Sequence, residues 1–226
     1  MSHYSDAFET ESLEIRRFAI GAFAVNTYIV MHKSSHDAVI IDPGGDSAEV
    51  ADAVRNMGAV PRRLLFTHCH IDHVAGASAM KKAFPEALVT YHELDQIVAD
   101  SLGMQSRMFG VPEVEMPGCD RNLRAEMEFM AGSLQFVTFL TPGHTPGSVV
   151  YYMPLEKLAW TGDLLFKGSV GRTDFEGGSG TDLVKSLQEM MRILPDDTRL
   201  LPGHGKYTTM GQEKANNFYL RIDRYR

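Results

Sequence analysis

Four potential metal ligands lie within six consecutive positions of the run Thr67-His68-Cys69-His70-Ile71-Asp72-His73. Imidazole nitrogens and carboxylate oxygens are the usual ligands of Zn²⁺, and they also suit Fe²⁺ and Mn²⁺. The run follows a short apolar segment, 62–66, that we predict to be a strand, and it precedes a segment, 74–80, that we predict to begin a helix. Because open α/β sheets bind ligands at the carboxyl ends of their strands, this position suits a metal site.

The spacing within this run suggests two metal positions. His68 and His70 point to the same side of an extended chain, because side chains alternate with a period of two, so they can bind one ion together. Asp72 and His73 lie beyond the turn and can reach a second position, and metal pairs about 3.5–4 Å apart are known in hydrolytic enzymes. Taken singly, these histidines could be surface residues and Asp72 could cap the following helix. Their density favours metal binding.

Length and charge exclude several classes of protein. The chain has 226 residues, of which 44% are hydrophobic and 23% charged, as in ordinary globular proteins. Its net charge of −7 disfavours nucleic acid as a partner. Two cysteines, Cys69 and Cys119, do not make a disulfide framework, and we expect both to be reduced. Residues 1–14 lack a signal-peptide pattern and no apolar stretch reaches the ~20 residues of a membrane helix, so we expect a soluble, cytoplasmic protein without membrane contact.

Predicted strands and helices alternate twice along the chain, which suggests two sheets that each need cover on one face. The predicted strands are 13–18, 26–31, 38–42, 62–66, 88–91, 134–140, 149–153, 158–161 and 199–201. The predicted helices are 50–57 (with Asp46 or Ser47 as N-cap), 74–84, 94–102, 181–194 and 211–219. We therefore expect an α/β (α+β) fold, arranged as a four-layer αββα sandwich.

Two segments are predicted to lack regular structure. Residues 1–11 are predicted to be a loose leader, and residues 103–118 an irregular connection rich in methionine. The methionines of this connection, among them Met104 and Met108, are either filler in the core or a mobile wall over a substrate.

Three further strand ends carry a candidate ligand. His144 lies in the turn Pro142-Gly143-His144-Thr145-Pro146-Gly147, Asp163 follows Trp160-Thr161-Gly162, and His204 lies in Pro202-Gly203-His204-Gly205. Glycine and proline fix a backbone that presents one side chain rigidly. Alone, Asp163 could be a cap and His204 an exposed loop residue. We favour metal binding because all the candidate ligands are expected at the same edge of one sheet, where a carboxylate can bridge two cations.

These motifs, taken in order, resemble those of the metallo-β-lactamase superfamily. The set T-H-x-H-x-D-H, P-G-H-T-P-G, T-G-D and P-G-H-G spans residues 67 to 205, and I-D-P-G at 41–44 extends it. The resemblance implies two divalent metal ions, with zinc as first candidate and iron or manganese as alternatives. It implies one ion on His68, His70 and His144, a second ion on Asp72, His73 and His204, and Asp163 as a bridge.

A finer resemblance is to the short, type II glyoxalase II-like hydrolases, which are similar to hydroxyacylglutathione hydrolases. It rests on G-D-L-L-F at 162–166, on G-S-V-G-R-T-D-F at 168–175 and on Tyr91-His92-Glu93. The chain ends soon after His204, so the glutathione-binding residues of the full-length enzymes have no counterpart. We therefore expect 1–226 to be a single domain of this fold without their C-terminal helical domain.

The resemblance implies hydrolysis of a small-molecule thioester, such as glutathione-linked S-D-lactoylglutathione, by a metal-bound hydroxide. Asp72 would orient the water or take its proton as well as bind metal, and Asp163 would share the catalytic centre. Arg172 is a candidate for binding a substrate carboxylate, because its planar fork suits that group. Its alternative is a structural ion pair with Asp174 or Glu176. Lys206 and Tyr207, beside His204, are further candidates for substrate binding.

Other activities of the same fold remain as alternatives. Persulfide dioxygenases share the G-R-T-D-F stretch and would use one Fe²⁺ on His68, His144 and Asp163. The motif Pro202-Gly203-His204-Gly205 resembles the hydrolase form and favours hydrolysis. Lactonase, β-lactamase and phosphodiesterase activities stay open, as does a closed metal site without catalysis.

Overall fold

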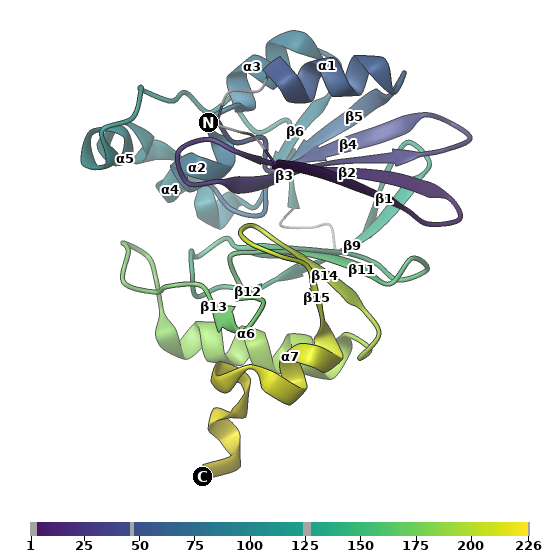
Figure 1. Ribbon diagram of the computed structural model, residues 1–226. Helices are drawn as coiled ribbons and strands as arrows, with labels where there is room; N and C mark the ends of the chain where they lie inside the picture. The colour runs from purple at the N-terminus through teal and green to yellow at the C-terminus, as the bar shows by residue number, and fades with distance from the viewer. Residues whose placement is uncertain (1–3, 46–47, 124–127, 226) are drawn as a thin grey trace.

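Two β-sheets pack face to face, and helices cover the outer face of each (Figure 1). The computed structural model describes residues 4–45, 48–123 and 128–225. The four layers αββα predicted from the sequence are present. The predicted N-cap positions Asp46 and Ser47 lie outside the described residues.

The first sheet has seven strands in the order β1-β2-β3-β4-β5-β6-β7. The strands are β1 (Tyr4–Glu9), β2 (Leu13–Ile20), β3 (Val25–His32), β4 (Asp37–Ile41), β5 (Val60–Leu65), β6 (Leu88–Tyr91) and β7 (Arg121–Asn122). Strands β1 to β4 pair antiparallel, whereas β4 to β7 pair parallel. Because β4 and β5 run in the same direction, Asp42 and the run 67–73 follow them at the same edge of the sheet.

The second sheet has six strands in the order β15-β14-β11-β10-β9-β8. The strands are β8 (Glu128–Ala131), β9 (Leu134–Leu140), β10 (Val149–Met153), β11 (Leu158–Gly162), β14 (Arg199–Pro202) and β15 (Thr208–Thr209). A separate hairpin consists of β12 (Leu165–Phe166) and β13 (Ser169–Val170). Strands β9, β11 and β14 run in one direction, so the turns that carry His144, Asp163 and His204 also meet at one edge.

Helices divide between the outer faces and the edge that carries the candidate ligands. Figure 1 shows α1 (Ala48–Asn56) and α3 (Ala77–Ala83) over the first sheet, and α6 (Gly180–Ile193) and α7 (Met210–Asn216) over the second. At the edge with the candidate ligands lie α2 (Ile71–Val74), η1 (Glu93–Asp95), α4 (Gln96–Asp100) and α5 (Leu102–Phe109), whereas η3 (Phe218–Tyr225) follows α7 (Figure 1). Among the described helices, none combines the length and the apolar character needed to cross a bilayer.

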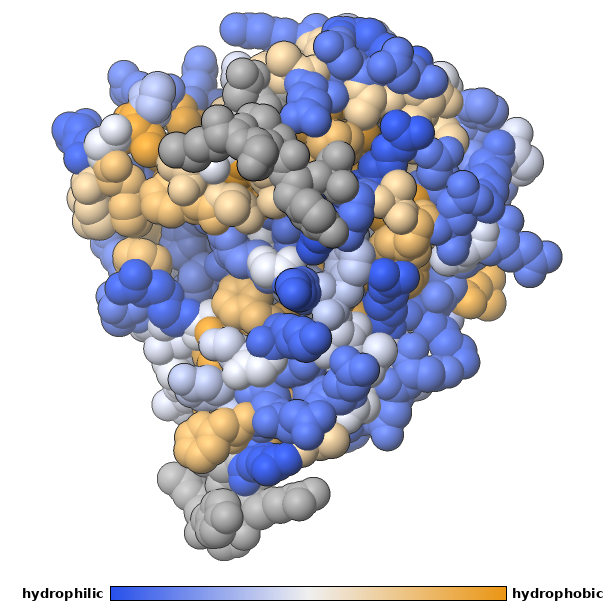
Figure 2. Space-filling model, viewed as in Figure 1, coloured by the Kyte–Doolittle hydropathy of each residue, from blue (hydrophilic) through white to orange (hydrophobic). Residues whose placement is uncertain are grey.

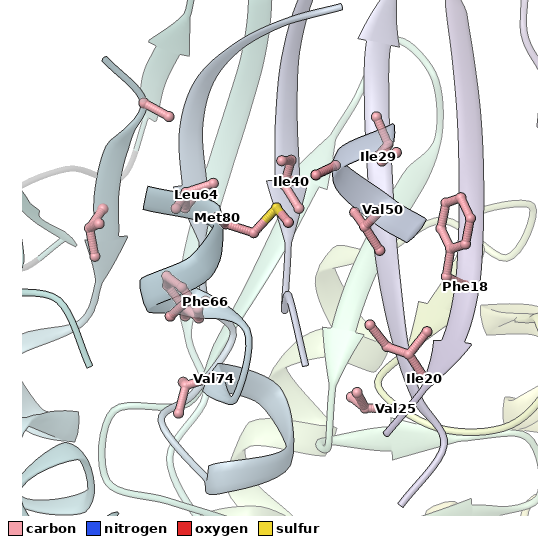
Figure 3. Close-up of a cluster of buried hydrophobic side chains, with 14 of the residues drawn as sticks. Phe18, Ile20, Val25, Ile29, Ile40, Val50, Leu64, Phe66, Val74 and Met80 are labelled. Atoms are coloured by element: carbon pink, nitrogen blue, oxygen red, sulfur yellow. The ribbon is translucent and has the colours of Figure 1, made fainter. Parts of the chain in front are cut away.

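Three apolar clusters hold the layers together. One joins the first sheet to α1 and α3, and Figure 3 shows its side chains, with Val50 and Met80 of these helices facing Ile29, Ile40 and Leu64 of the strands. The second lies between the sheets, and the third joins the second sheet to α6 and α7. Fully burying one large apolar side chain contributes about 1.5–3 kcal/mol. The candidate ligands therefore lie at the rim of a rigidly packed scaffold.

Two predictions of irregular structure were wrong. Residues 4–9 form β1, which pairs with β2 along its whole length, although residues 1–11 were predicted to be a loose leader. The predicted irregular connection 103–118 begins inside α5, which ends at Gly110 in a left-handed conformation (φ 65°). Only residues 110–118 of that connection lack regular structure.

Candidate metal centre

The structure brings all seven predicted ligands together at one edge of the sandwich, but they come from both sheets and not from the one sheet that we predicted. The loop after β5 carries His68 and His70, and the helix α2 that follows this loop carries Asp72 and His73. The turns after β9, β11 and β14 contribute the other three, His144, Asp163 and His204. Three groups have ligand atoms within 4.8 Å of one another: His68, His70 and His144; His68, His73 and Asp163; and Asp72, His73 and His204.

The first group, which is made of His68, His70 and His144, consists of three imidazoles. Nδ1 of His70 lies 2.9 Å from Nε2 of His144, and the ring of His68 lies 4.9 and 4.7 Å from the rings of His70 and His144. Burial, and then the charge of His144, lower the pKa of His70 to about 3. Burial also lowers the pKa of His68. These two imidazoles are therefore neutral, which is the form that binds a metal ion.

Asp72, His73 and His204, which we call the second group, combine two imidazoles with a carboxylate. Nε2 of His204 lies 3.1 Å from Oδ2 of Asp72, and Nε2 of His73 lies 3.7 Å from the same oxygen. Burial opposes a charge on His73, but the carboxylates of Asp72 and Asp163 outweigh it and raise its pKa well above the usual value. Unlike the first group, this group contains a carboxylate.

Asp163 lies between the two groups. Its Oδ1 is 3.3 Å from Nε2 of His73, and its Oδ2 is 3.5 Å from Nε2 of His144 and 3.7 Å from Nε2 of His204. Burial would raise the pKa of this carboxyl, but the neighbouring histidines, His73 first, hold it well below its usual range. A buried carboxylate that faces both groups occupies the position that a bridging ligand requires.

Three buried atoms of the cluster make no well-aligned hydrogen bond among the described residues, namely Nε2 of His68, Nε2 of His73 and Oδ1 of Asp163, the last two of which lie 3.3 Å apart. Leaving a buried polar atom without a partner costs about 1–3 kcal/mol, so such atoms indicate a missing ligand. The available donors are imidazole nitrogens and carboxylate oxygens, which suit divalent zinc, iron and manganese. These residues therefore fit the divalent ions implied by the sequence motifs.

Removing bound metal ions with a chelator is expected to lower the melting temperature by about 5–10 °C. The reason is that the carboxylates of Asp72 and Asp163 would lose the cations that offset their charge inside the fold. Thermal unfolding, measured beside metal analysis of the same samples, checks this. Zinc, iron and manganese, added back separately, show which ion restores stability. Equal melting temperatures for metal-free and metal-loaded protein would contradict the expectation.

Asp42 contacts His73 of the second group directly and His68 of the first group through Thr67, a role that we did not predict from the sequence. Its Oδ1 accepts from the Thr67 amide at 2.7 Å, and its Oδ2 accepts from the Thr67 hydroxyl at 2.7 Å and lies 3.0 Å from Nδ1 of His73. The Thr67 hydroxyl also lies 3.1 Å from Nδ1 of His68. Such outer partners fix the orientation of ligating histidines. The sequence shows Asp42 only as part of the I-D-P-G motif.

Asp95 joins two of the ligand-bearing loops and was also missed. Its Oδ2 accepts from the Cys69 amide at 2.7 Å, and its Oδ1 accepts from the Gly147 amide at 2.7 Å. The side chain is fully buried, and burial raises the pKa of its carboxyl. The loop of His68 and His70 is thereby fixed to the turn that carries His144. No sequence signal marks Asp95, because it stands in an ordinary acidic helix start.

Asp95→Asn is expected to lower the free energy of unfolding of the metal-free protein by about 1–3 kcal/mol. The amide can still accept from one backbone N–H, but its NH₂ group then faces the other. Urea unfolding measures the loss, with Asp100→Asn on the exposed face of α4 as the matched control. Identical unfolding curves for the Asp95→Asn variant and the unmodified protein would show that Asp95 does not hold the loops together.

Two glycines of the motifs are explained by close approach. A Cβ atom at Gly203 would lie 2.3 Å from Oδ1 of Asp163 and 2.6 Å from Cε1 of His73. Gly162 has a left-handed backbone (φ 48°), and a Cβ there would lie 2.5 Å from the Thr67 hydroxyl oxygen. A side chain at either position would push the ligands apart.

A cavity of about 540 Å³ opens onto the cluster. Arg172 lines it, and its guanidinium makes two 2.6 Å hydrogen bonds to Asp174 and lies 4.1 Å from the centroid of the Phe175 ring. The backbone carbonyl of Arg172 accepts from Nδ1 of His144 at 2.7 Å. The structure therefore contains the ion pair of Arg172 with Asp174 that was the alternative role. Binding of a substrate by Arg172 stays a prediction.

Lys206 and Tyr207 are not among the described residues that line this cavity. The Tyr207 hydroxyl instead donates to Asp6 at 2.9 Å, and its ring packs edge-on against Phe8. The side chain of Lys206 is exposed. Their predicted role in substrate binding therefore receives no support from the cavity.

Comparison with known proteins agrees with this geometry. Residues 20–204 match the sequence model of the metallo-beta-lactamase superfamily. The hydroxyacylglutathione hydrolase GloC of Haemophilus influenzae is 34% identical over 209 residues, which cover 92% of this chain and 98% of that protein.

Two solved structures are also similar. The B3 metallo-beta-lactamase BLEG-1 has a TM-score of 0.85 at 33% identity, with coverage of 91% of this chain and 99% of that one. The protein TTHA1623, solved in a di-iron-bound form, has a TM-score of 0.81 at 33% identity, with coverage of 89% and 98%. The chain therefore belongs to the metallo-beta-lactamase superfamily, as one of its metallohydrolases.

Proposed function

We propose that this chain hydrolyses a small-molecule thioester, with S-D-lactoylglutathione as the first candidate substrate. The observation that carries the proposal is the second ligand group, Asp72, His73 and His204, which lies beside the three-histidine group. A dioxygenase with a single facial-triad iron needs no second group, whereas a hydrolase with two metal ions does. The similarity to the hydroxyacylglutathione hydrolase GloC supports the substrate class.

The residues of the centre have separate roles in this proposal. The ion-holding groups would be His68, His70 and His144 for one ion, and Asp72, His73 and His204 for the other, with Asp163 between them. Divalent ions bound there would lower the pKa of a coordinated water molecule and polarise the substrate carbonyl. Asp72 also lines the cavity, where its carboxylate can accept a hydrogen bond from water and orient that water toward the acyl carbon.

The reaction makes modest demands on the rest of the site. Water supplies a hydroxyl to the acyl carbon, the carbon–sulfur bond breaks, and the departing thiolate takes up the remaining proton. Because thiols have a pKa of about 8.5, the thiolate leaves with little assistance from an acid. A site with ligands for metal ions, a carboxylate to orient water and a cavity for the substrate is sufficient for this chemistry.

His204→Ala distinguishes the two reaction classes and is expected to lower thioester hydrolysis by about 100-fold. Its imidazole belongs to the second group alone and has no place in a single-iron site on His68, His144 and Asp163. The measurement is S-D-lactoylglutathione hydrolysis by protein whose metal content is known. His36→Asn, in the exposed turn between β3 and β4, is the matched control, since asparagine tolerates the positive φ of 61° there.

Absence of turnover of S-D-lactoylglutathione and of simple acyl thioesters, in protein that holds two metal ions per chain, would contradict the thioesterase proposal. The similarity to BLEG-1 then makes β-lactams the next substrates to test. Oxygen consumption with glutathione persulfide by protein that holds one iron, unchanged in the His204→Ala variant, would instead support the dioxygenase.

A further inference from the structure

The wall of the cavity away from the ligand cluster is apolar and partly open to solvent. Ile97 of α4 and Met108 of α5 are more than half exposed (58% and 63%), and Met104 is exposed to 43%. The Phe109 ring lies 5.2 Å from the Phe23 ring and 6.3 Å from the Phe175 ring. Figure 2 shows apolar side chains at the surface on the side of the molecule where α5 lies. Exposed apolar surface of this kind beside a reaction centre marks a binding site.

The polar side chains of this wall are already bonded to the protein. The Gln105 carbonyl accepts from the Ile71 amide at 2.9 Å, and its NH₂ group donates to Val98 at 3.2 Å and to Ser101 at 2.9 Å. The Ser101 hydroxyl in turn donates to the Val98 carbonyl at 2.8 Å. These groups hold α2, α4 and α5 together, so a substrate finds few open hydrogen-bonding groups on this wall.

The charges of the wall do not suit glutathione, which carries two carboxylates. Apart from the histidines, Arg172 is the one cation among the described residues that line the cavity. Its guanidinium group already donates two hydrogen bonds to Asp174. Glu176 lines the same cavity and would repel an anion. Electrostatics therefore favour a neutral substrate arm along this wall.

Space for a longer arm continues beyond Phe23. A second cavity of about 320 Å³ shares Phe23, Ile71 and Asp72 with the first, and apolar residues such as Ile20 and Val114 also line it. The two cavities therefore adjoin along the Phe23 side chain. A flexible chain attached to the reacting group can lie on the methionines and reach into this space.

We infer that the preferred substrate carries an apolar arm, on the acyl or the thiol side of the bond that is cleaved, which lies against Met104, Met108 and Phe109. This inference rests on the proposed thioester hydrolysis and specifies its substrate class. Methionine suits the task because its unbranched side chain adapts to chains of different shape. The apolar arm gains affinity by removing its own surface and that of the wall from water.

Two matched series of thioesters test the inference with metal-loaded protein. The first varies the acyl group, with acetyl, butanoyl and octanoyl thioesters of N-acetylcysteamine. The second keeps acetyl and varies the thiol, from ethanethiol through butanethiol to octanethiol, so the side that carries the arm is identified. In one series kcat/KM is expected to rise about fourfold for each methylene that the wall buries, and to exceed that of S-D-lactoylglutathione at the longest chain.

A double variant, Met104→Gln with Met108→Gln, tests whether the apolar arm of the substrate lies on this wall. Both side chains are substantially exposed, so the fold is expected to persist, which thermal unfolding verifies. The ratio of kcat/KM between the longest and shortest chain is expected to fall at least about fivefold. Met130→Gln on β8, with a side chain that is also about half exposed (52%) and does not line the cavity, is the control that leaves this ratio unchanged.

The outcomes separate this inference from the proposed function. If thioesters are cleaved but kcat/KM is independent of chain length in both series, the apolar arm is wrong and thioester hydrolysis stands. If no thioester is cleaved, the proposed function fails. Binding of the S-ethyl and S-octyl thioethers of N-acetylcysteamine then tests whether the wall accepts an apolar arm. Tenfold or tighter binding of the octyl compound, lost in the double methionine variant, supports the arm, and equal binding of the two compounds overturns it.

Discussion

Asp163→Ala is expected to lower kcat/KM for thioester hydrolysis at least about 1,000-fold and to reduce the number of metal ions that each chain retains. Asp163 is the carboxylate that faces both ligand groups, with Oδ1 toward His73 and Oδ2 toward His144 and His204. Alanine removes its negative charge from among buried imidazoles and would leave both proposed ions with fewer ligands. A loss of about 4 kcal/mol in transition-state stabilisation corresponds to that fall in rate.

Asp163→Asn separates the charge of this side chain from its shape. Asparagine keeps one oxygen ligand but cannot offset two cations, so its activity is expected to lie between those of alanine and aspartate. Metal analysis and kinetics are measured on the same preparations, with Asp52→Ala on α1 as a control for an exposed carboxylate. Full metal content in Asp163→Ala with more than a tenth of the original activity would exclude a bridging role for Asp163.

The candidate ligands could be predicted because their signals are local. At each of the four motifs a predicted strand ends within a few residues of a histidine or aspartate, and at three of them a glycine or proline turn accompanies it. Ligands in open α/β sheets bind at the carboxyl ends of strands, so such strand ends are the places where a site is expected. The structure adds the distances, and these show Asp163 between the two groups.

The supporting carboxylates could not be predicted, because their partners are distant in sequence. Asp42 bonds Thr67 at a separation of 25 residues, and Asp95 bonds Gly147 at a separation of 52. Neither contact leaves a periodic pattern. Both side chains accept from backbone amides of the ligand loops, so they act through loop geometry, which only the tertiary structure reveals.

The two errors in secondary structure have different origins. The β1 sequence is polar and has no strand signal of its own, and its pairing with β2 provides the stabilisation. In the 103–118 segment, glycine and proline suggested a loop throughout. Gly110 is in fact the left-handed C-terminal end of α5, a signal for a helix stop that could have been recognised.

Asp42→Asn is expected to weaken metal binding about 10–100-fold, with a matching loss of activity at limiting metal concentration. The buried carboxylate accepts two hydrogen bonds from Thr67 and lies 3.0 Å from Nδ1 of His73. An amide turns one acceptor into a donor, so either Thr67 or His73 loses its partner. Asparagine also tolerates the positive φ of 49° at this position, so the effect comes from the side chain rather than from the backbone.

A second buried carboxylate makes the Asp42 experiment specific. Asp37, at the other end of β4, accepts from the Ser133 amide at 2.8 Å and pairs with Arg62, far from the ligand groups. Asp37→Asn is therefore expected to lower the free energy of unfolding while metal affinity stays unchanged. Metal titrations and unfolding curves for both variants separate the two effects. If Asp37→Asn weakens metal binding as much as Asp42→Asn does, general loss of stability explains both results, and Asp42 does not orient His73.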